Sequence, residues 1–155
     1  MSKLIVKLAC GVLIMLIAIV SASACTTEMA EPEYANQMTE SALQGVNNGD
    51  YAKFTEYFSP LSKALITEVA FSEKCQQVKS IIGDYIDKEF WKTGTEEGYT
   101  VVYYKARFSE EPEDVLVRVY FEEKDGEMYI SDFELSSPKL NTLATSTTST
   151  TSTGE

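Results

Sequence analysis

The sequence predicts an α+β domain in which three N-terminal helices pack on a curved antiparallel sheet of about four strands. Two observations support this prediction. The spacing of apolar residues is helical from about residue 34 to residue 83, and from residue 84 onward it is that of strands. Turn-forming residues separate the strands, as in an antiparallel meander. Helices followed by antiparallel strands are typical of a domain whose helices cover one face of the sheet.

The first predicted helix has apolar residues at three- and four-residue spacing, namely Ala35, Met38, Ala42 and Val46. Pro32 suits its first turn, because proline lacks the amide hydrogen that a first turn leaves unused. The run Asn47-Asn48-Gly49 is a stop signal. We therefore expect this helix to lie on the sheet with one apolar face.

Two more helices follow. Asp50 is placed to cap the second helix, and Ser59 with Pro60 predicts the start of a further helical piece. A third helix is expected to start near Ser72 and to end at Gly83, with Cys75 facing inward.

Four segments read as strands, and the dipeptide Asp125-Gly126 joins the last two. Both residues of this dipeptide tolerate a positive φ, so it predicts a tight type I′ hairpin turn. Ser109 to Glu113, with Pro112, predicts a looser connection. The expected strands are residues 85–91, 99–108, 114–123 and 127–135.

Residues 1–25 are typical of an export signal: Lys3 and Lys7 precede an apolar run that ends in Ser21-Ala22-Ser23-Ala24-Cys25. The last four residues are similar to a lipobox, which would make Cys25 the lipidation site. Cleavage after Ala24 to give a soluble protein and retention as an uncleaved membrane anchor are the alternatives. All three outcomes predict an exported protein, and two of them anchor it at the outer face of the cytoplasmic membrane or in the cell envelope.

Composition divides the rest of the chain into three parts. Residues 26–33 form a polar tether, residues 34–140 form the α+β domain, and residues 141–155 form a tail of mostly Thr and Ser. Such a tail has too little apolar surface to fold, so we expect it to be disordered, with hydroxyl groups that could carry O-linked sugar.

Charge and cysteine content restrict the partners and the chemistry. The formal net charge is -11, which disfavours nucleic acid as a partner. Cys75 is the one cysteine of the predicted domain, so no disulfide is expected there, and a buried, unreactive thiol is the simplest interpretation. The acidic segment 110–114 matches no calcium-binding loop. The sequence predicts no metal site and no cofactor.

One set of short motifs extends over the predicted domain: Asn48-Gly49-Asp50-Tyr51, Phe54, Phe58, Ser59-Pro60, Gly83, residues 99–108 and Ser136-Ser137-Pro138-Lys139. With these motifs the domain resembles a family of small exported domains of unknown function, DUF 3887, over roughly residues 34–140. Such domains are similar to the nuclear-transport-factor-2-like (cystatin-like) superfamily. The resemblance implies a cone-shaped α+β fold whose curved sheet and helices often enclose a pocket.

The chain contains no histidine, which excludes the Asp–His pairs that enzymes of that superfamily commonly use. A carboxylate with a tyrosine remains possible, because these two groups suffice in some isomerases. With a two-residue turn at Asp125-Gly126, Val119 would pair with Asp132 and place that carboxylate on the core face. Asp132 and Tyr104 are therefore the catalytic candidates. A single bulge in the hairpin would turn Asp132 into solvent instead.

Tyr103, Arg118 and Trp91 are the candidates for ligand binding, and packing or ion pairing across the sheet is the alternative for each. Tyr103 and Tyr104 must face opposite sides of the sheet.

The strands carry apolar residues on both faces, which predicts a covered outer face or a cavity. Homodimerisation through the open sheet face is our first explanation for this pattern. We expect a noncatalytic ligand-binding or protein-interaction module of the cell envelope, with an unidentified small-molecule ligand. A pocket enzyme of the isomerase or hydrolase type and a structural surface protein are the alternatives.

Overall fold

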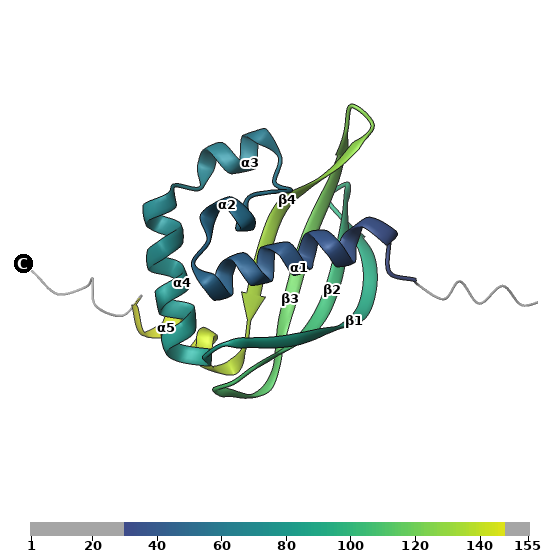
Figure 1. The fold of residues 1–155 in the computed structure, drawn as a ribbon. Coiled ribbons are helices and arrows are strands. Elements are labelled where there is room, and N and C mark those ends of the chain that lie inside the picture. Colours follow the sequence, from purple (N-terminus) through teal and green to yellow (C-terminus); the bar gives the residue numbers. More distant parts are fainter. Residues whose placement is uncertain (1–29, 148–155) are drawn as a thin grey trace, which may run out of the picture.

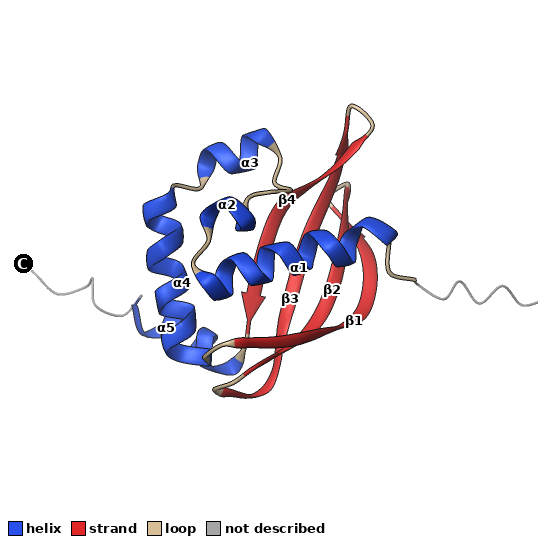
Figure 2. Cartoon of the chain, viewed as in Figure 1, coloured by secondary structure: helices blue, strands red, loops and turns tan. Residues whose placement is uncertain are grey.

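The computed structural model describes residues 30–147, which form a four-stranded sheet with helices on one of its faces. Figure 1 shows α1 lying across the sheet, with α2, α3 and α4 grouped beside β4. The expected α+β class is confirmed, as is the order of helices before strands (Figure 2).

Helix α1 spans Glu33–Asn48 and ends where the sequence predicted. Gly49 follows it with φ of 66°, the left-handed conformation that closes many helices and that glycine adopts without strain. Pro32 lies one residue before the helix, at the N-cap position.

Within residues 30–147, four helices, and not three, precede the sheet. The segment after α1 divides into α2, Tyr51–Phe54, and α3, Pro60–Leu65, because Asp50 and Ser59 each cap the start of a separate turn with a side-chain oxygen. Helix α4 spans Glu68–Ile82, so it begins earlier than predicted, with Thr67 as its N-cap. It ends at Gly83, as predicted.

The sheet is an antiparallel meander in the order β1-β2-β3-β4, as expected. Its strands are β1, Tyr85–Glu96, β2, Tyr99–Phe108, β3, Glu111–Lys124, and β4, Glu127–Ser136. The predicted turn at Asp125 and Gly126 is confirmed, with φ of 56° and 83°. Glu97 and Gly98 make a second turn of this kind, with φ of 50° and 91°, and extend β1 beyond the predicted end.

The core lies between the sheet and the helices. Leu43 of α1 and Ile82 of α4 are fully buried against the helix-facing side chains of the strands. Burying each such aliphatic side chain stabilises the fold by about 1.5 to 3 kcal/mol. The fully buried residues of the strands on this side are Val102, Tyr104, Ala106, Val115, Val117, Val119, Phe121 and Ile130.

Helix α5 spans Pro138–Thr147 and packs against α4. The Ser137 hydroxyl accepts a hydrogen bond from the Leu140 amide at 3.2 Å, and the buried Glu111 carboxylate accepts one from the Lys139 amide at 3.4 Å. We predicted a disordered tail from residue 141, whereas the structure is helical up to residue 147. The capped start of α5 explains the difference, because it lets the helix continue into the Thr-rich segment.

The predicted signal segment, Cys25 and the last eight residues of the tail lie outside the described residues. Among the helices within residues 30–147, none has the length and apolar character needed to span a membrane.

Candidate functional site

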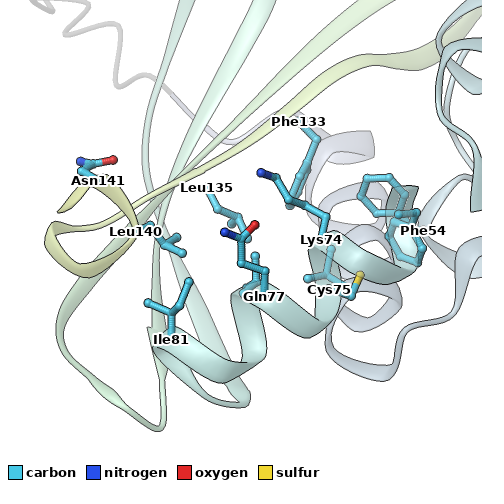
Figure 3. A pocket seen from close by; sticks show the side chains of 12 residues that line it. Phe54, Lys74, Cys75, Gln77, Ile81, Phe133, Leu135, Leu140 and Asn141 are labelled. Atoms are coloured by element: carbon cyan, nitrogen blue, oxygen red, sulfur yellow. The ribbon is translucent and has the colours of Figure 1, made fainter. Parts of the chain in front are cut away.

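An apolar pocket of about 400 Å³ lies between α4, β4 and α5 (Figure 3). Its walls come from segments far apart in the sequence, which only the fold brings together. The residues that line it are Val46, Phe54, Phe71, Lys74, Cys75, Gln77, Val78, Ile81, Phe133, Leu135, Leu140 and Asn141.

The α4 side of the pocket follows from helical periodicity. Phe71, Cys75 and Val78 recur at four- and three-residue spacing, so they share one face of α4. On the opposite side, Phe133 and Leu135 are two residues apart on β4 and therefore point to the same face of the sheet.

Aromatic rings close the inner end of the pocket. The ring of Phe54 stacks on Phe71 with centroids 4.6 Å apart and meets Phe133 edge-on at 5.7 Å. Phe54 also contacts Phe58, at 4.7 Å. Contacts of this kind fix ring orientation, so this wall is well defined without a ligand.

Three polar side chains lie at the outer side of the pocket: Lys74, Gln77 and Asn141. Lys74 and Gln77 project from α4 toward β4, with their nitrogen atoms over the space between the two elements (Figure 3). The arrangement therefore combines an apolar interior with one cationic and two amide groups at its edge.

Cys75 is the free thiol of the pocket and is buried, as the sequence predicted. Burial raises the pKa of the Cys75 thiol to about 11, so the thiol stays protonated at neutral pH. Since the thiolate is the nucleophile, Cys75 is a poor candidate for covalent chemistry and acts as part of the apolar wall.

Of the two alternatives for Asp132, the core-facing one is wrong, and the structure has the other, in which a bulge in the hairpin turns the carboxylate into solvent. The hairpin keeps the predicted register as far as Phe121 and Ile130, but a bulge follows, so Tyr120 and not Val119 lies opposite Asp132. The extra residue turns the side chain of Asp132 out into solvent, where it is exposed.

Tyr104 faces the helices and is buried, but it lines neither this pocket nor a site with Asp132. Its hydroxyl donates a hydrogen bond of 2.6 Å to the carboxylate of Glu31. Burial, followed by this hydrogen bond, raises the pKa of Tyr104 far above its ordinary value. Tyr104 therefore has a structural role: its ring packs in the core, and its hydroxyl connects β2 to Glu31 in the segment before α1.

The three ligand-binding candidates gather on the outer face of the sheet. The Trp91 and Tyr103 rings meet edge-on at 6.3 Å, and Arg118 lies opposite Tyr103 in the strand register. Arg118 forms an ion pair with Glu134 on β4, which is the cross-sheet ion pairing that the sequence offered as the alternative to ligand binding. The ammonium group of Lys92 lies 4.8 Å from the Trp91 ring and 4.4 Å from the Tyr103 ring.

The Tyr103 hydroxyl donates a hydrogen bond to Glu96, and this bond, with burial, raises the pKa of Tyr103 to about 12. Tyr103 and Val101 are both buried although they face away from the helices. Neighbouring side chains of the same chain therefore cover part of the apolar outer face.

The sequence placed Cys75 on an inward helical face but did not predict a pocket there. Leu140 was assigned to the end of the domain, with no helix after it. A capping serine, Ser137, followed by Pro138 was the signal for α5 that could have been recognised.

The fold and the pocket define an α+β domain with helices on one face of an antiparallel sheet and an apolar cavity between the two layers. A family model described as "Protein of unknown function (DUF3887)" matches residues 39–133. The chain belongs to this family, as the resemblance in the sequence implied. The matched region runs from α1 into β4 and contains most of the pocket wall.

The chain is also similar to a solved structure, a SEC-C motif containing protein from Rhodopseudomonas palustris. The sequence identity is 16% and the TM-score is 0.46, over 64% of this chain and 77% of that chain. A search of curated proteins found no match.

Proposed function

We propose that this domain is a noncatalytic binding module that accepts an apolar ligand in the pocket between α4, β4 and α5. The observation that carries the proposal is the composition of the wall: nine of its residues are apolar or are the protonated thiol of Cys75. The volume of about 400 Å³ lies within the usual range for small-molecule sites.

The edge of the pocket suggests the class of ligand. A molecule with an apolar body and a polar or anionic end, such as an acyl chain with its carboxylate, would bury the body among the aromatic and aliphatic side chains. Its polar end would then meet Lys74 and the two amides. Each buried CH₂ group contributes about 0.8 kcal/mol, so about ten buried groups supply the roughly 8 kcal/mol of micromolar binding, before the cost of association is subtracted.

Two valines of α4 provide a matched test. Val78 lines the pocket, whereas Val69 is 71% exposed and lies outside it. In a displacement assay with a fluorescent fatty-acid probe, Val78→Trp should fill the cavity and weaken binding by at least about tenfold, which is 1.4 kcal/mol. Val69→Trp should leave the affinity unchanged. Equal affinities for the two variants would contradict the proposal.

Cys75 provides a second readout at the same site. Its thiol should react slowly with N-ethylmaleimide at neutral pH, because burial keeps it protonated. A bound acyl ligand should slow the reaction further. Peptide mass spectrometry separates Cys75 from Cys10 and Cys25, so the full chain can be used. An unchanged labelling rate at saturating ligand would place the ligand elsewhere.

We also propose that the domain is exported and held at the cell envelope through a lipid on Cys25. The basic start, the apolar run and the small residues before Cys25 support this. Mass spectrometry of the mature N-terminus should find an acylated Cys25, and Cys25→Ser should release the protein from the membrane fraction. An N-terminus at Met1 with an unmodified Cys25 would favour an uncleaved anchor.

The similarity to the nuclear-transport-factor-2-like superfamily remains part of this proposal. A sheet covered by helices on one face, with a pocket between the layers, supports it. The enzyme alternative has less support, since Asp132 faces the outer side of the sheet whereas Tyr104 faces the helices. The two side chains therefore do not meet in one site.

A further inference from the structure

A second hollow lies at the other end of the helical layer, between α3 and the strand ends, with a volume of about 590 Å³. We call it the α3 groove. Leu61 and Leu65 of α3 line it and are 70% and 78% exposed. They are four residues apart, so they form one apolar ridge along the helix. The groove is lined by Phe58, Leu61, Ser62, Leu65, Ile66, Glu96, Glu97, Tyr99, Tyr120, Ser131, Asp132 and Glu134.

The strands and the turn between β1 and β2 give the groove an acidic wall. Four carboxylates line it, and its lining residues, all in the described part of the chain, include no lysine or arginine. Arg118 neutralises Glu134 from outside the groove, and Glu96 accepts hydrogen bonds from the hydroxyls of Tyr103 and Tyr120. The negative charge of Glu97 and Asp132 therefore remains uncompensated by any ion pair among the described residues.

Hydrogen bonds between α3 and β4 hold the groove in shape. The Ser62 hydroxyl donates to the Ser131 carbonyl at 2.8 Å, and the Ser59 amide donates to the Ile130 carbonyl at 2.9 Å. Ser131 lies at the bulge that turns Asp132 away from the core. The same irregularity thus anchors α3 and presents a carboxylate to the groove.

We propose that the α3 groove docks a short basic amphipathic segment of a partner protein. Apolar side chains of that segment would cover Leu61 and Leu65, and its lysine or arginine side chains would face Glu97 and Asp132. Charge complementarity supports this occupant, because opposite potentials steer association and fix the register of an interface. The proposal is independent of ligand binding in the apolar pocket.

Charge also argues against two other occupants. A second copy of this chain carries a net charge of -11, so the carboxylates of the groove would repel it. The same carboxylates would repel an anionic membrane surface. A basic partner gains from these charges and also buries the exposed leucines.

The test uses the full chain, kept in a fixed concentration of non-ionic detergent, and a fluorescein-labelled 14-residue helical peptide of leucine and lysine. Fluorescence anisotropy should show saturable binding that weakens as salt is raised. A peptide with glutamate in place of lysine should bind at least tenfold more weakly. Equal binding of the two peptides would overturn the proposal.

Variants locate the binding surface. The double variant Leu61→Ser/Leu65→Ser should weaken peptide binding by at least tenfold, and Glu97→Gln/Asp132→Asn should weaken it severalfold and reduce its salt dependence. Two substitutions outside the groove, Val69→Ser and Glu113→Gln, serve as matched controls and should have no effect. Far-ultraviolet circular dichroism and thermal melting establish that each variant is folded.

The proposal would be overturned if both groove variants bound the peptide with wild-type affinity. It would also be overturned if the Val69→Ser and Glu113→Gln controls weakened peptide binding as much as the groove variants do. The pocket variant Val78→Trp should bind the peptide normally. Normal peptide binding by this variant would show that the α3 groove works without the apolar pocket. Each proposal can therefore fail while the other stands.

Discussion

Glu40 illustrates how single residues connect α1 to the sheet. Its carboxylate accepts hydrogen bonds from Gln44 at 3.1 Å and from the Tyr85 hydroxyl at 2.9 Å. It also lies 3.4 Å from the ammonium group of Lys88, whose side chain is only 6% exposed. Burial works to raise the pKa of Glu40, but these hydrogen bonds and the charge of Lys88 outweigh it and lower the pKa below its ordinary value.

A lowered carboxyl pKa predicts a stability that depends on pH. Glu40 contributes stability above the ordinary pKa of 4.5, and this contribution is lost as the pH falls through the lower pKa of the folded state. Glu40→Gln should therefore cost about 1 to 2 kcal/mol at pH 7, because Lys88 loses its charged partner. The cost should shrink as the pH falls below that ordinary value.

Urea unfolding of both proteins between about pH 7 and pH 3 measures this difference. Glu73→Gln is the control, because Glu73 is an exposed carboxylate of α4, and its substitution should change stability by less than about 0.5 kcal/mol. A difference between wild type and Glu40→Gln that stays constant with pH would contradict the assignment.

Asp132 shows how far one residue can change a prediction. The alternation of side chains along β3 and β4 predicted the pairing of the two strands correctly as far as Phe121 and Ile130. One bulge after Ile130 then placed the Asp132 carboxylate on the other face of the sheet. Nothing in the local sequence required that bulge. It is associated with the hydrogen bonds from α3 to β4, which join residues far apart in the chain.

At the scale of elements, the contact between α1 and α2 depends on Gly45. A methyl group there would lie 2.5 Å from the amide nitrogen of Phe54 and 2.6 Å from its α-carbon. Both atoms belong to the backbone, so the helices would have to move apart. Phe54 would move with α2 and disturb the inner wall of the apolar pocket.

Gly45→Ala should therefore destabilise the domain by about 2 kcal/mol or more, although alanine favours a helix over glycine by up to about 1 kcal/mol. Gly49→Ala is the comparison, because nothing lies within 4 Å of its methyl position and only the positive φ is unfavourable. We expect a cost of about 1 kcal/mol there. Thermal and urea unfolding measure both. A stabilising effect of Gly45→Ala would contradict the close contact.

Of the two tight turns between strands, the sequence predicted one and missed the other. Asp125-Gly126 was recognised because Asp before Gly is a common hairpin signal. Glu97-Gly98 adopts the same positive φ values, but glutamate rarely does so, and the turn was missed. The pairing of two long strands on either side holds Glu97 in this conformation.

At the scale of the whole molecule, homodimerisation through the outer sheet face stays a prediction. Trp91 is 49% exposed on this face, beside Tyr103. If the face is an interface, Trp91→Glu should place a charge in it and weaken the dimer by at least tenfold, about 1.4 kcal/mol. Analytical ultracentrifugation of the full chain measures the effect, with Val69→Glu on α4 as the control. A wild-type chain that is monomeric at high concentration would contradict the prediction.

The apolar pocket and the α3 groove also belong to this scale, because each is assembled from at least three elements. Truncation of α5 would remove Leu140 from the pocket without touching α4 or β4. Both proposed sites therefore lie in the spaces between elements, where no local motif marks them.

The sequence by itself determined the class of fold, the order of helices and strands, the ends of α1 and α4, and the family. These features follow from local chemistry: the period of the apolar residues, the capping side chains and the glycines that accept a positive φ. The tertiary structure alone decided the face of Asp132, the burial of Tyr104 outside the apolar pocket, and the positions of the apolar pocket and the α3 groove. These depend on contacts between distant segments, whose bulges and packing no short stretch of sequence encodes.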